Sequence, residues 1–254
     1  FPGQAGIATD EQAEGWLAVA DQVHEAGGTL FMQIMHGGRT SHPDLIDGAD
    51  PEAPSSFDWG GTVRGFSGKM DAPVPRELKK EELPRIVEEF RQGARRAIDA
   101  GVDGVEIHGA NGYLLHEFMA ASSNKREDEF GGSPENRWRL PEMVIRAVAE
   151  EIGADRVGVR FSPAHNVQGV IEDDQDDMLA TYGGLLDALA PLNLAYVSLL
   201  HGEPESELIA TLAQKARANG VTKVLMNDGF PTVTSKEDAQ REIELDYVDA
   251  AVVG

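Results

Sequence analysis

The segment His108-Gly-Ala-Asn111-Gly-Tyr113 gathers side chains that can do chemistry on a carbonyl compound. His108 and Asn111 supply two neutral hydrogen-bond donors, and Tyr113 supplies a phenol. Donors of this kind can hold a carbonyl oxygen and withdraw electrons from it, while a phenol can deliver a proton. All three follow a short β-rich run, so they are expected on the turn that leaves a strand. The segment therefore predicts a site where a carbonyl group is polarised and a proton is transferred.

Polar residues recur at the ends of predicted strands, where a buried strand would otherwise be apolar. They are Gln33, His108, Arg160 and Asn227. One polar residue in such a place is commonly a structural group whose hydrogen bonds are satisfied. Four of them favour a functional rim, because the carboxyl ends of parallel strands meet at one face of a barrel.

Hydrophobic periodicity alternates along the chain between β-rich and helical segments. Strands are predicted over 29–34, 104–108, 156–161, 194–199, 223–227 and 249–253. The first helix follows the capping box Thr9-Asp-Glu-Gln12 and stops at Gly27. The other helices are predicted over 83–100, 133–152, 174–189 and 205–218, and from Thr234 onward.

This order of elements is typical of repeated βα units around a parallel sheet. Two connections after strands, 37–76 and 109–132, are far longer than such units need, and in a β/α barrel they lie on the carboxyl face, where active sites form. Residues 1–254 are therefore interpreted as a single domain with an α/β fold of the (β/α)₈ TIM-barrel class. Because six units cannot close an eight-stranded barrel, its first two strands and last helix are expected outside this sequence. A complete doubly wound domain is the alternative, although no Gly-x-Gly-x-x-Gly turn follows its first strand.

The composition limits the classes of partner and compartment. Lys and Arg number 22 against 44 Asp and Glu, and the net charge of −22 disfavours nucleic acid as a partner. No apolar run is long enough to cross a bilayer, and the sequence contains no cysteine for a disulfide or a thiolate site. A cytoplasmic protein is expected. The acidic excess fits an ordinary cytosolic enzyme or a salt-adapted host, and folding at low and high salt would separate the two.

Several motifs together resemble the old yellow enzyme family. The His108 segment is continued by Ser123-Asn-Lys-Arg-Glu-Asp-Glu-Phe-Gly-Gly-Ser-Pro-Glu-Asn-Arg137. In the family's order stand also residues 2–12, Gln33-Ile-Met-His-Gly-Gly-Arg39, Val157-Gly-Val-Arg-Phe-Ser-Pro163 and Asn227-Asp-Gly-Phe230. So many spaced motifs are far more specific than a single short pattern. The resemblance implies an FMN-dependent barrel oxidoreductase that reduces activated C=C bonds with NADPH or NADH.

The resemblance implies a role for each matching residue of the rim. Gln33 and Arg160 match positions that contact the flavin ring, where Arg160 would stabilise negative charge on the reduced flavin. His108 and Asn111 match the pair that hydrogen-bonds the carbonyl or nitro oxygen of the substrate. Tyr113 matches the donor that protonates the α-carbon once hydride has added at the β-carbon. The implied substrates are small enones, enals or nitro compounds.

The resemblance also implies a phosphate site at Asp228, Gly229 and Gly254. In the family, backbone N–H groups of the loop after Asn227 approach the FMN phosphate, and glycine is usual where this chain has Asp228. A carboxylate there is repelled by a phosphate dianion unless it turns to solvent. Gly254 resembles the start of a phosphate-binding Gly-Arg pair.

Two other functions stay open at the level of sequence. Asp228 and the expected missing ends suggest a non-catalytic barrel remnant that binds a ligand or partner, which bound flavin would distinguish from an enzyme. A metal-dependent barrel hydrolase is the third hypothesis, but His36 and His42 have no convergent carboxylates at suitable spacing, so no metal is expected. His116 is interpreted as an ordinary helix or loop residue. The oligomeric state is open, and a homo-oligomer is one of the states considered.

Overall fold

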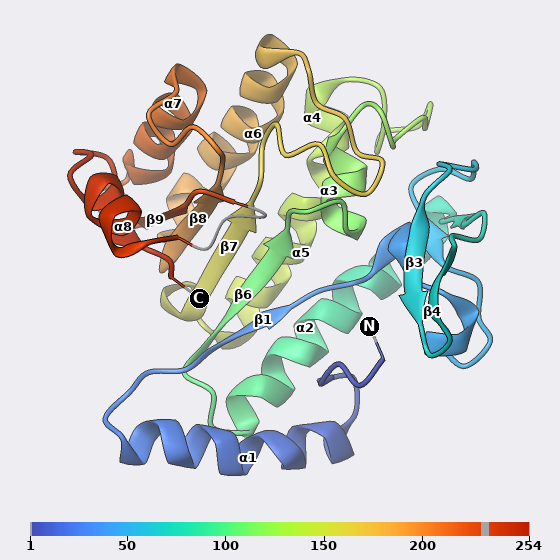
Figure 1. The fold of residues 1–254 in the computed structure, drawn as a ribbon, viewed down its shortest axis with the longest axis horizontal. Coiled ribbons are helices and arrows are strands. Elements are labelled where there is room, and N and C mark those ends of the chain that lie inside the picture. The colour runs from blue at the N-terminus through green and yellow to red at the C-terminus, as the bar shows by residue number, and fades with distance from the viewer. Residues whose placement is uncertain (1, 230–233, 254) are drawn as a thin grey trace.

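Six parallel strands form one sheet in the computed structural model, which describes residues 2–229 and 234–253. Across the sheet they follow chain order: β1 (Phe31–Ile34), β6 (Gly104–Gly109), β7 (Val157–Phe161), β8 (Tyr196–Leu200), β9 (Lys223–Asn227) and β10 (Ala250–Ala251). Each pair of neighbours is parallel, and their carboxyl ends reach the same rim (Figure 1). The strands predicted from the sequence are confirmed, with β10 shorter than predicted.

The helices that follow the strands cover one face of the sheet (Figure 1). They are α2 (Leu83–Asp99), α5 (Arg139–Ile152), α6 (Gln175–Leu189), α7 (Glu207–Arg217) and α8 (Lys236–Ile243). The helix α1 (Asp10–Glu25) instead precedes β1 and packs against α2. Thr9 forms the predicted capping box with Gln12 at the start of α1, whereas Ser235 rather than Thr234 caps α8. None of the helices in the described ranges has the length and apolar character that crossing a membrane requires.

One predicted helix is divided in the structure. Instead of a continuous helix over 133–152, a short α4 (Pro134–Arg137) precedes α5, and Trp138 joins them. The backbone of Trp138 has φ −86° and ψ 0°, which lies outside the usual range for the middle of an α-helix. Ser133 caps α4 as the sequence predicts, because its side chain accepts a hydrogen bond from the backbone N–H of Asn136.

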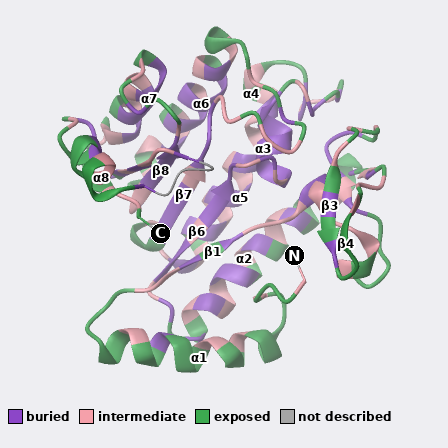
Figure 2. Cartoon of the chain, in the orientation of Figure 1, coloured by how far each residue is buried: buried purple, intermediate pink, exposed green. Residues whose placement is uncertain are grey.

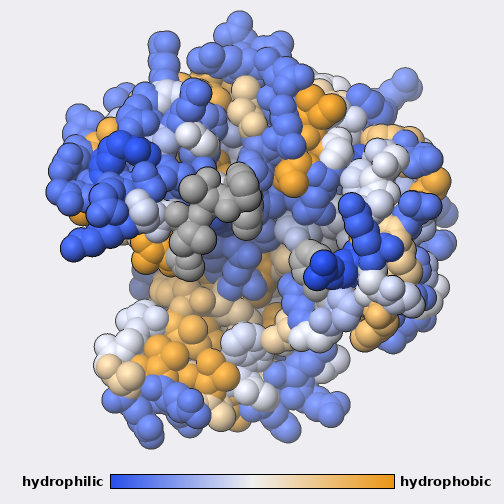
Figure 3. Space-filling view, viewed as in Figure 1, coloured by the Kyte–Doolittle hydropathy of each residue, from blue (hydrophilic) through white to orange (hydrophobic). Residues whose placement is uncertain are grey.

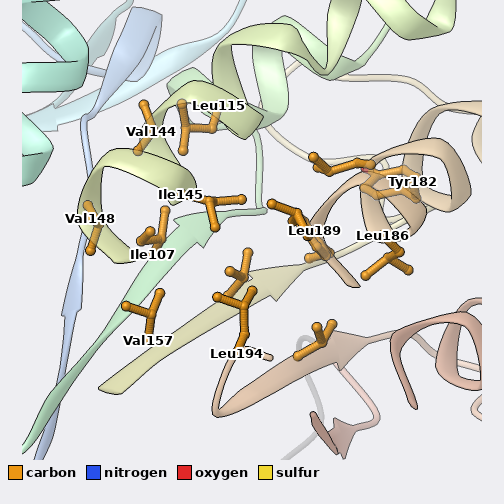
Figure 4. Close-up of a cluster of buried hydrophobic side chains, with 14 of the residues drawn as sticks. Ile107, Leu115, Val144, Ile145, Val148, Val157, Tyr182, Leu186, Leu189 and Leu194 are labelled. Carbon is orange, nitrogen blue, oxygen red and sulfur yellow. The ribbon is translucent and has the colours of Figure 1, made fainter. Parts of the chain in front are cut away.

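The hydrophobic core lies between the sheet and its helices. The strand residues that face the helices are apolar and at most 1% exposed on β6 and β7: Val105, Ile107, Val157, Val159 and Phe161. Figure 4 shows Ile107 and Val157 beside Val144, Ile145 and Val148 of α5, and Figure 2 shows the same buried layer running through the sheet. Burying each such side chain stabilises the fold by about 1.5–3 kcal/mol. Because side chains alternate along a strand, the intervening residues point to the other, concave face.

Two aromatic rings cover the amino-terminal end of that concave face. Phe31 and Tyr196 stand on β1 and β8, and their ring centroids are 5.5 Å apart. Gly104 and Gly158 lie on the two strands between them, and an added Cβ at either glycine would collide with Phe31 or Tyr196. The two glycines therefore leave the room that the rings occupy, and the polar residues nearer the carboxyl ends stand above this aromatic layer.

The long connection after β1 contains structure that the sequence did not predict. Its middle forms the antiparallel hairpin of β3 (Thr62–Gly65) and β4 (Gly68–Asp71), and its two ends pair through β2 (Glu52–Ala53) and β5 (Arg76–Glu77). Glu52 lies among Arg76, Arg85 and His36. Its contacts with His36 and then Arg85 lower the pKa of its carboxyl to about 2, although burial acts in the opposite direction. This ion-pair cluster fastens the connection to the start of α2.

Candidate active site

The residues predicted to form a functional rim lie on the concave face of the sheet. Gln33 is the register partner of Glu106, and His108 is the partner of Arg160 on the next strand. Glu106 and His108 are two residues apart on β6, so their side chains point to the same face. The amide nitrogen of Gln33 donates to the carboxylate of Glu106 over 2.5 Å. Glu106 was missed by the sequence analysis, although its spacing from His108 was a usable signal.

Arg160 is the central cation of this face. Its guanidinium donates to the hydroxyl of Ser198 at 3.3 Å and to the side-chain oxygen of Asn227 at 3.0 Å. Burial lowers the pKa of Arg160, and the negative charge of Glu106 opposes that change. A guanidinium stays protonated under such a perturbation. The structure therefore joins the predicted residues Arg160 and Asn227 and presents a fixed positive charge in the concavity.

The turn after β6 brings the predicted donors together. The rings of His108 and Tyr113 approach to 5.0 Å between centroids, at an interplanar angle of 57°. Asn111 and Gly112 both have left-handed backbones, with φ of 55° and 75°, and together they reverse the chain between the two rings. The backbone N–H of Asn111 donates to the hydroxyl of Ser162 over 2.8 Å, which fastens the turn to the end of β7.

Two polar atoms of this group have no hydrogen-bond partner within the described chain. They are Nδ1 of His108 and Oδ1 of Asn111, and both are buried. A buried polar group without a partner costs about 1–3 kcal/mol, so such atoms commonly mark a place where a ligand binds. An amide can present either its oxygen or its NH₂ group by rotation. The unpaired atoms are therefore suited to a ligand that carries its own hydrogen-bonding oxygen.

His108 is uncharged at neutral pH. Burial is the main cause that lowers the pKa of its imidazole to about 3, and the positive charge of Arg160 adds to the effect. The ring is only 4% exposed. A neutral imidazole has one N–H, so it can donate to a ligand oxygen but cannot serve as a strong acid near pH 7. The phenol of Tyr113 is left as the group able to supply a proton.

A broad cleft of about 1020 Å³ borders the site along β1. Gln33 and Tyr113 line it, together with Trp16 and Phe31 at one end and Val63 of the β3–β4 hairpin at the other. Figure 3 shows a hydrophobic area on this side, between α1 and the amino-terminal ends of the strands. The cleft is not lined by His108, Asn111 or Arg160. These three residues are assigned to the candidate site by their hydrogen-bonding geometry and not by the shape of the cleft.

The motif that continues the His108 segment is structural. Arg126 donates through Nη1 to the carbonyl oxygens of Pro54 and Leu78, at 3.1 and 2.5 Å. Arg137 donates to the carbonyl oxygens of Met119 and Gly132, at 2.7 and 2.6 Å. Both arginines are buried. They close the two long connections and hold the short helix α3 (Leu114–Met119), which begins directly after Tyr113.

The predicted phosphate loop is described as far as Gly229. The carboxylate of Asp228 does not turn to solvent: Arg241 of α8 donates to it at 3.3 Å, and its side chain is only 12% exposed. The neighbouring carboxyl of Glu242 has its pKa raised to about 8, by burial and then by the charge of Asp228. Gly229 has φ 89°, a left-handed backbone that favours glycine. The other predicted phosphate residue, Gly254, lies outside the described residues.

The histidines set aside in the sequence have other partners. Nε2 of His36 lies 3.5 Å from Glu52, and Nδ1 of His42 lies 3.6 Å from Asp44. Within residues 2–229 and 234–253, no three side chains of the metal-binding types converge. His116 lies on a helix, α3, as one of the two predicted placements has it, but it is not an ordinary helix residue, because it is fully buried and contacts the turn of Asn111.

A family model described as NADH:flavin oxidoreductase / NADH oxidase matches residues 1–253. Flavin oxidoreductase hxnT of Emericella nidulans is 36% identical over 274 residues, which cover 100% of this chain and 69% of the relative. The 12-oxophytodienoate reductase 1 of Oryza sativa subsp. japonica is 45% identical over 174 residues, which cover 68% of this chain and 45% of the relative. The chain thus spans only about half to two thirds of the length of these relatives.

Solved structures agree with the family match. An old yellow enzyme homologue from Zymomonas mobilis superposes with a TM-score of 0.87 at 33% identity, covering 98% of this chain and 69% of that one. Morphinone reductase in complex with tetrahydroNAD gives 0.83 at 34% identity, covering 97% of this chain and 67% of that one. The predicted fold class is confirmed: the parallel sheet and its helices have the fold of the old yellow enzyme (β/α)₈ barrels.

Proposed function

Because the chain belongs to the NADH:flavin oxidoreductase / NADH oxidase family, we propose that its protein is an FMN-dependent ene-reductase. The substrates we propose are α,β-unsaturated carbonyl and nitro compounds. Reductases of 12-oxophytodienoate and of morphinone among the similar proteins support an activated C=C bond as the target. When bound, FMN would supply the redox chemistry, which is the transfer of a hydride from NADPH or NADH to the β-carbon of the substrate.

The residues of the concave face fit a planar, polar and anionic cofactor. Arg160 offers a fixed positive charge, held by Ser198 and Asn227, where reduced flavin carries negative charge. Gln33 offers an amide on the same face. The carboxylate of Asp228 is paired with Arg241, so its charge is compensated near the proposed phosphate site. Gly229 and Gly254 complete that site in our proposal, through backbone N–H groups.

His108 and Asn111 are the proposed clamp on the substrate oxygen. Each has a buried polar atom without a partner among the described residues, and His108 is held neutral by burial and by Arg160. Hydrogen bonds to the carbonyl or nitro oxygen withdraw electrons from the double bond and stabilise the charge that develops as hydride arrives. These two unpaired atoms, on a turn whose third polar side chain is a phenol, are the observation that carries the proposal.

Tyr113 is the proposed acid. Its ring packs against His108 and it lines the cleft, so the hydroxyl is near the clamp and open to incoming substrate. The α-carbon that becomes electron-rich when the β-carbon accepts hydride takes the phenolic proton. The phenolate then regains a proton from water. No metal takes part in this proposal, because the two hydrogen bonds polarise the carbonyl group.

The proposed reductant rests on the family, and the proposed location rests on the composition. We propose NADPH or NADH as the source of hydride, since one solved relative holds tetrahydroNAD and the family is described by its NADH chemistry. A cytoplasmic location is proposed because a sequence without cysteine gains nothing from an oxidising compartment. Both the proposed reductant and the proposed location are proposals about the whole protein.

An absorbance experiment on the full-length protein tests the function. The purified protein should be yellow, should bleach when NADPH or NADH is added without oxygen, and should recover its colour when 2-cyclohexenone is added. A chelator should change neither step. Colourless protein that does not take up FMN on reconstitution would contradict the proposal and favour a barrel that binds ligands without turnover.

A further inference from the structure

The turn that holds Asn111 has a backbone that needs outside support. Asn111 and Gly112 are consecutive left-handed residues, and only glycine adopts that region at little cost. An added Cβ at Gly112 would lie 2.8 Å from the side chain of Gln168 and 2.9 Å from the carbonyl oxygen of Val167. Gln168 in turn donates to the carbonyl oxygen of Asn111 over 2.7 Å. The turn is thus pressed against the segment that follows β7.

His116 provides the support from inside the protein. Its Nδ1 accepts a hydrogen bond of 2.9 Å from the backbone N–H of Gly112. Because Nδ1 is the acceptor, the proton of the neutral ring is on Nε2. Nε2 lies 3.3 Å from the carboxylate of Glu172, and the side chains of His116 and Glu172 are 0% and 6% exposed.

Glu172 is held in its turn by two further donors. The hydroxyl of Tyr182, on α6, donates to Glu172 at 2.9 Å, and the backbone N–H of Ala164 donates to it at 3.1 Å. The ring of Tyr182 is completely buried, and its pKa is raised chiefly by burial, so it remains a donor at all ordinary pH values. The four residues therefore form a polar chain: hydrogen bonds join Gly112 to His116 and Tyr182 to Glu172. A 3.3 Å contact between Nε2 of His116 and Glu172, which is not a hydrogen bond, joins the two pairs.

Such a chain is a costly way to fill space. Burying an imidazole, a carboxylate and a phenol is unfavourable compared with apolar side chains of the same volume, unless every group is satisfied. This polar chain ends on the backbone N–H of Gly112. Gly112 lies between Asn111, which belongs to the proposed clamp, and Tyr113, the proposed acid. The three side chains come from α3, from the connection after β7 and from α6, so the turn is tied to three separate elements.

We propose that His116 is a positioning residue, which Glu172 and Tyr182 hold in one orientation so that it fixes the turn carrying Asn111 and Tyr113. This inference rests on the proposed function. The side chains of Asn111 and Tyr113 must both contact one small substrate. A misplacement of about 1 Å can lower a rate about 100-fold. His116 touches neither substrate nor cofactor in this proposal and acts only through the backbone of Gly112.

Two substitutions of His116 separate positioning from general stability. In His116→Asn the amide oxygen takes the place of Nδ1 and can still accept from Gly112, whereas His116→Leu keeps the bulk and removes the acceptor. Val148→Ala, on the buried face of α5, is the matched control that lowers stability without touching the turn. All are made in the full-length, FMN-loaded protein, and Tyr182→Phe serves as a mild variant if His116→Leu does not fold.

The readouts are binding of 4-hydroxybenzaldehyde, followed by the flavin absorbance, and the separate rates of flavin reduction and of enone reduction. We expect His116→Leu to weaken the binding of 4-hydroxybenzaldehyde and to slow enone reduction, each by about tenfold or more. Flavin content and the rate of flavin reduction should stay within about twofold of the parent. His116→Asn should restore most of the loss, and Tyr182→Phe should show a smaller change in the same direction. Val148→Ala should melt earlier but bind the phenol normally.

Two results would overturn the inference. In the first, His116→Leu reduces enones and binds 4-hydroxybenzaldehyde as well as the parent does. If only Tyr182→Phe folds, the same result in that variant counts. The other is a loss in His116→Leu that Val148→Ala reproduces at the same loss of melting temperature. Failure of the proposed function looks different, because the unaltered protein would then hold no flavin or would not reduce 2-cyclohexenone.

Discussion

His108 and Tyr113 pack ring against ring at the carboxyl end of β6, with centroids 5.0 Å apart and planes inclined by 57°. A tilted pair of this kind is the arrangement that aromatic rings prefer, and it fixes each ring relative to the other. The buried imidazole supports the phenol that lines the cleft. A hydrogen-bond donor for the substrate oxygen and a proton donor for the neighbouring carbon therefore stand in a constant geometry.

Tyr113→Phe should uncouple the two half-reactions. Removing the hydroxyl leaves the ring against His108 but takes away the acid, and loss of such a group typically slows proton transfer by about 100-fold or more. Reduction of the flavin by NADPH or NADH should stay within about twofold of the parent, since it needs no acid. Stopped-flow absorbance of each half-reaction measures both rates. An unchanged rate of enone reduction would mean that another group supplies the proton.

Arg160→Lys should weaken the hold on FMN although it keeps the charge. An ammonium group cannot reproduce the fork that reaches both Ser198 and Asn227, which lie 3.3 and 3.0 Å from different nitrogens of Arg160. We expect the dissociation constant for FMN, measured by fluorescence, to rise about tenfold. Arg95→Lys is the control, because Arg95 pairs with Asp99 on the exposed side of α2, away from the concave face. Equal FMN binding in both variants would remove Arg160 from the cofactor site.

Replacing His108 with asparagine should flatten the dependence of stability on acidity. The imidazole has a pKa of about 3 in the fold and about 6.5 when unfolded, so between these values the unfolded chain binds the extra proton. The contribution of neutral His108 is present above pH 6.5 and is lost as the pH falls toward 3. Near pH 4.5 the loss is about 3 kcal/mol.

Urea unfolding of the parent and of His108→Asn, from pH 7 to pH 4.5, measures this difference. Carboxylates that titrate in the same range are common to both proteins and cancel in the comparison. The stability of the parent should fall more steeply than that of the variant. Parallel curves would show that the folded imidazole titrates normally and is not held neutral.

Glu117→Gln should stabilise the protein in alkaline solution. Glu117 is fully buried, its Oε2 has no partner in the described chain, and burial raises the pKa of its carboxyl to about 8 despite the charge of Arg39. The folded state therefore binds the extra proton between about pH 4.5 and 8, and the stability that this gives is lost as the pH rises through 8. A glutamine can still accept the hydrogen bond that Glu117 takes from the backbone N–H of Arg39.

The gain should be small near pH 5 and about 2–4 kcal/mol above pH 8. Thermal melts of both proteins at the two pH values provide the measurement. Asp187→Asn, on the surface near Lys215, is a control that should show no such trend with pH. A variant less stable than the parent at every pH would mean that Glu117 is ionised and well paired.

The sequence predicted the sheet and its helices because their patterns are local. Val105, Ile107, Val157 and Val159 alternate with polar or small residues, and this period decides which side faces the helices. The positions of His108 and Arg160 at the ends of predicted strands also indicated that they share one rim. The hairpin at Thr62–Asp71 was missed because its strands are short and mostly polar, so no hydrophobic period marks them.

The support of the turn could not be predicted in the same way. His116 was dismissed because nothing beside it in the sequence suggests a role, and its partner Glu172 comes from a different connection. The contact exists only because parallel strands bring the ends of β6 and β7 together. Helix α3 was missed for a similar reason: all six of its residues are buried, so it has no polar face to give a helical period.

Arg126 donates from one nitrogen to the carbonyl groups of both Pro54 and Leu78, so the segment between these two residues begins and ends at the same anchoring side chain. A loop whose ends are tied in this way can grow or shrink at modest entropic cost, since the penalty rises only slowly with length. Changes in the β3–β4 hairpin need not disturb the barrel beneath it. Because residues of the hairpin line the cleft, the segment between the two anchor points is a place where the shape of the cleft can be altered without rebuilding the sheet.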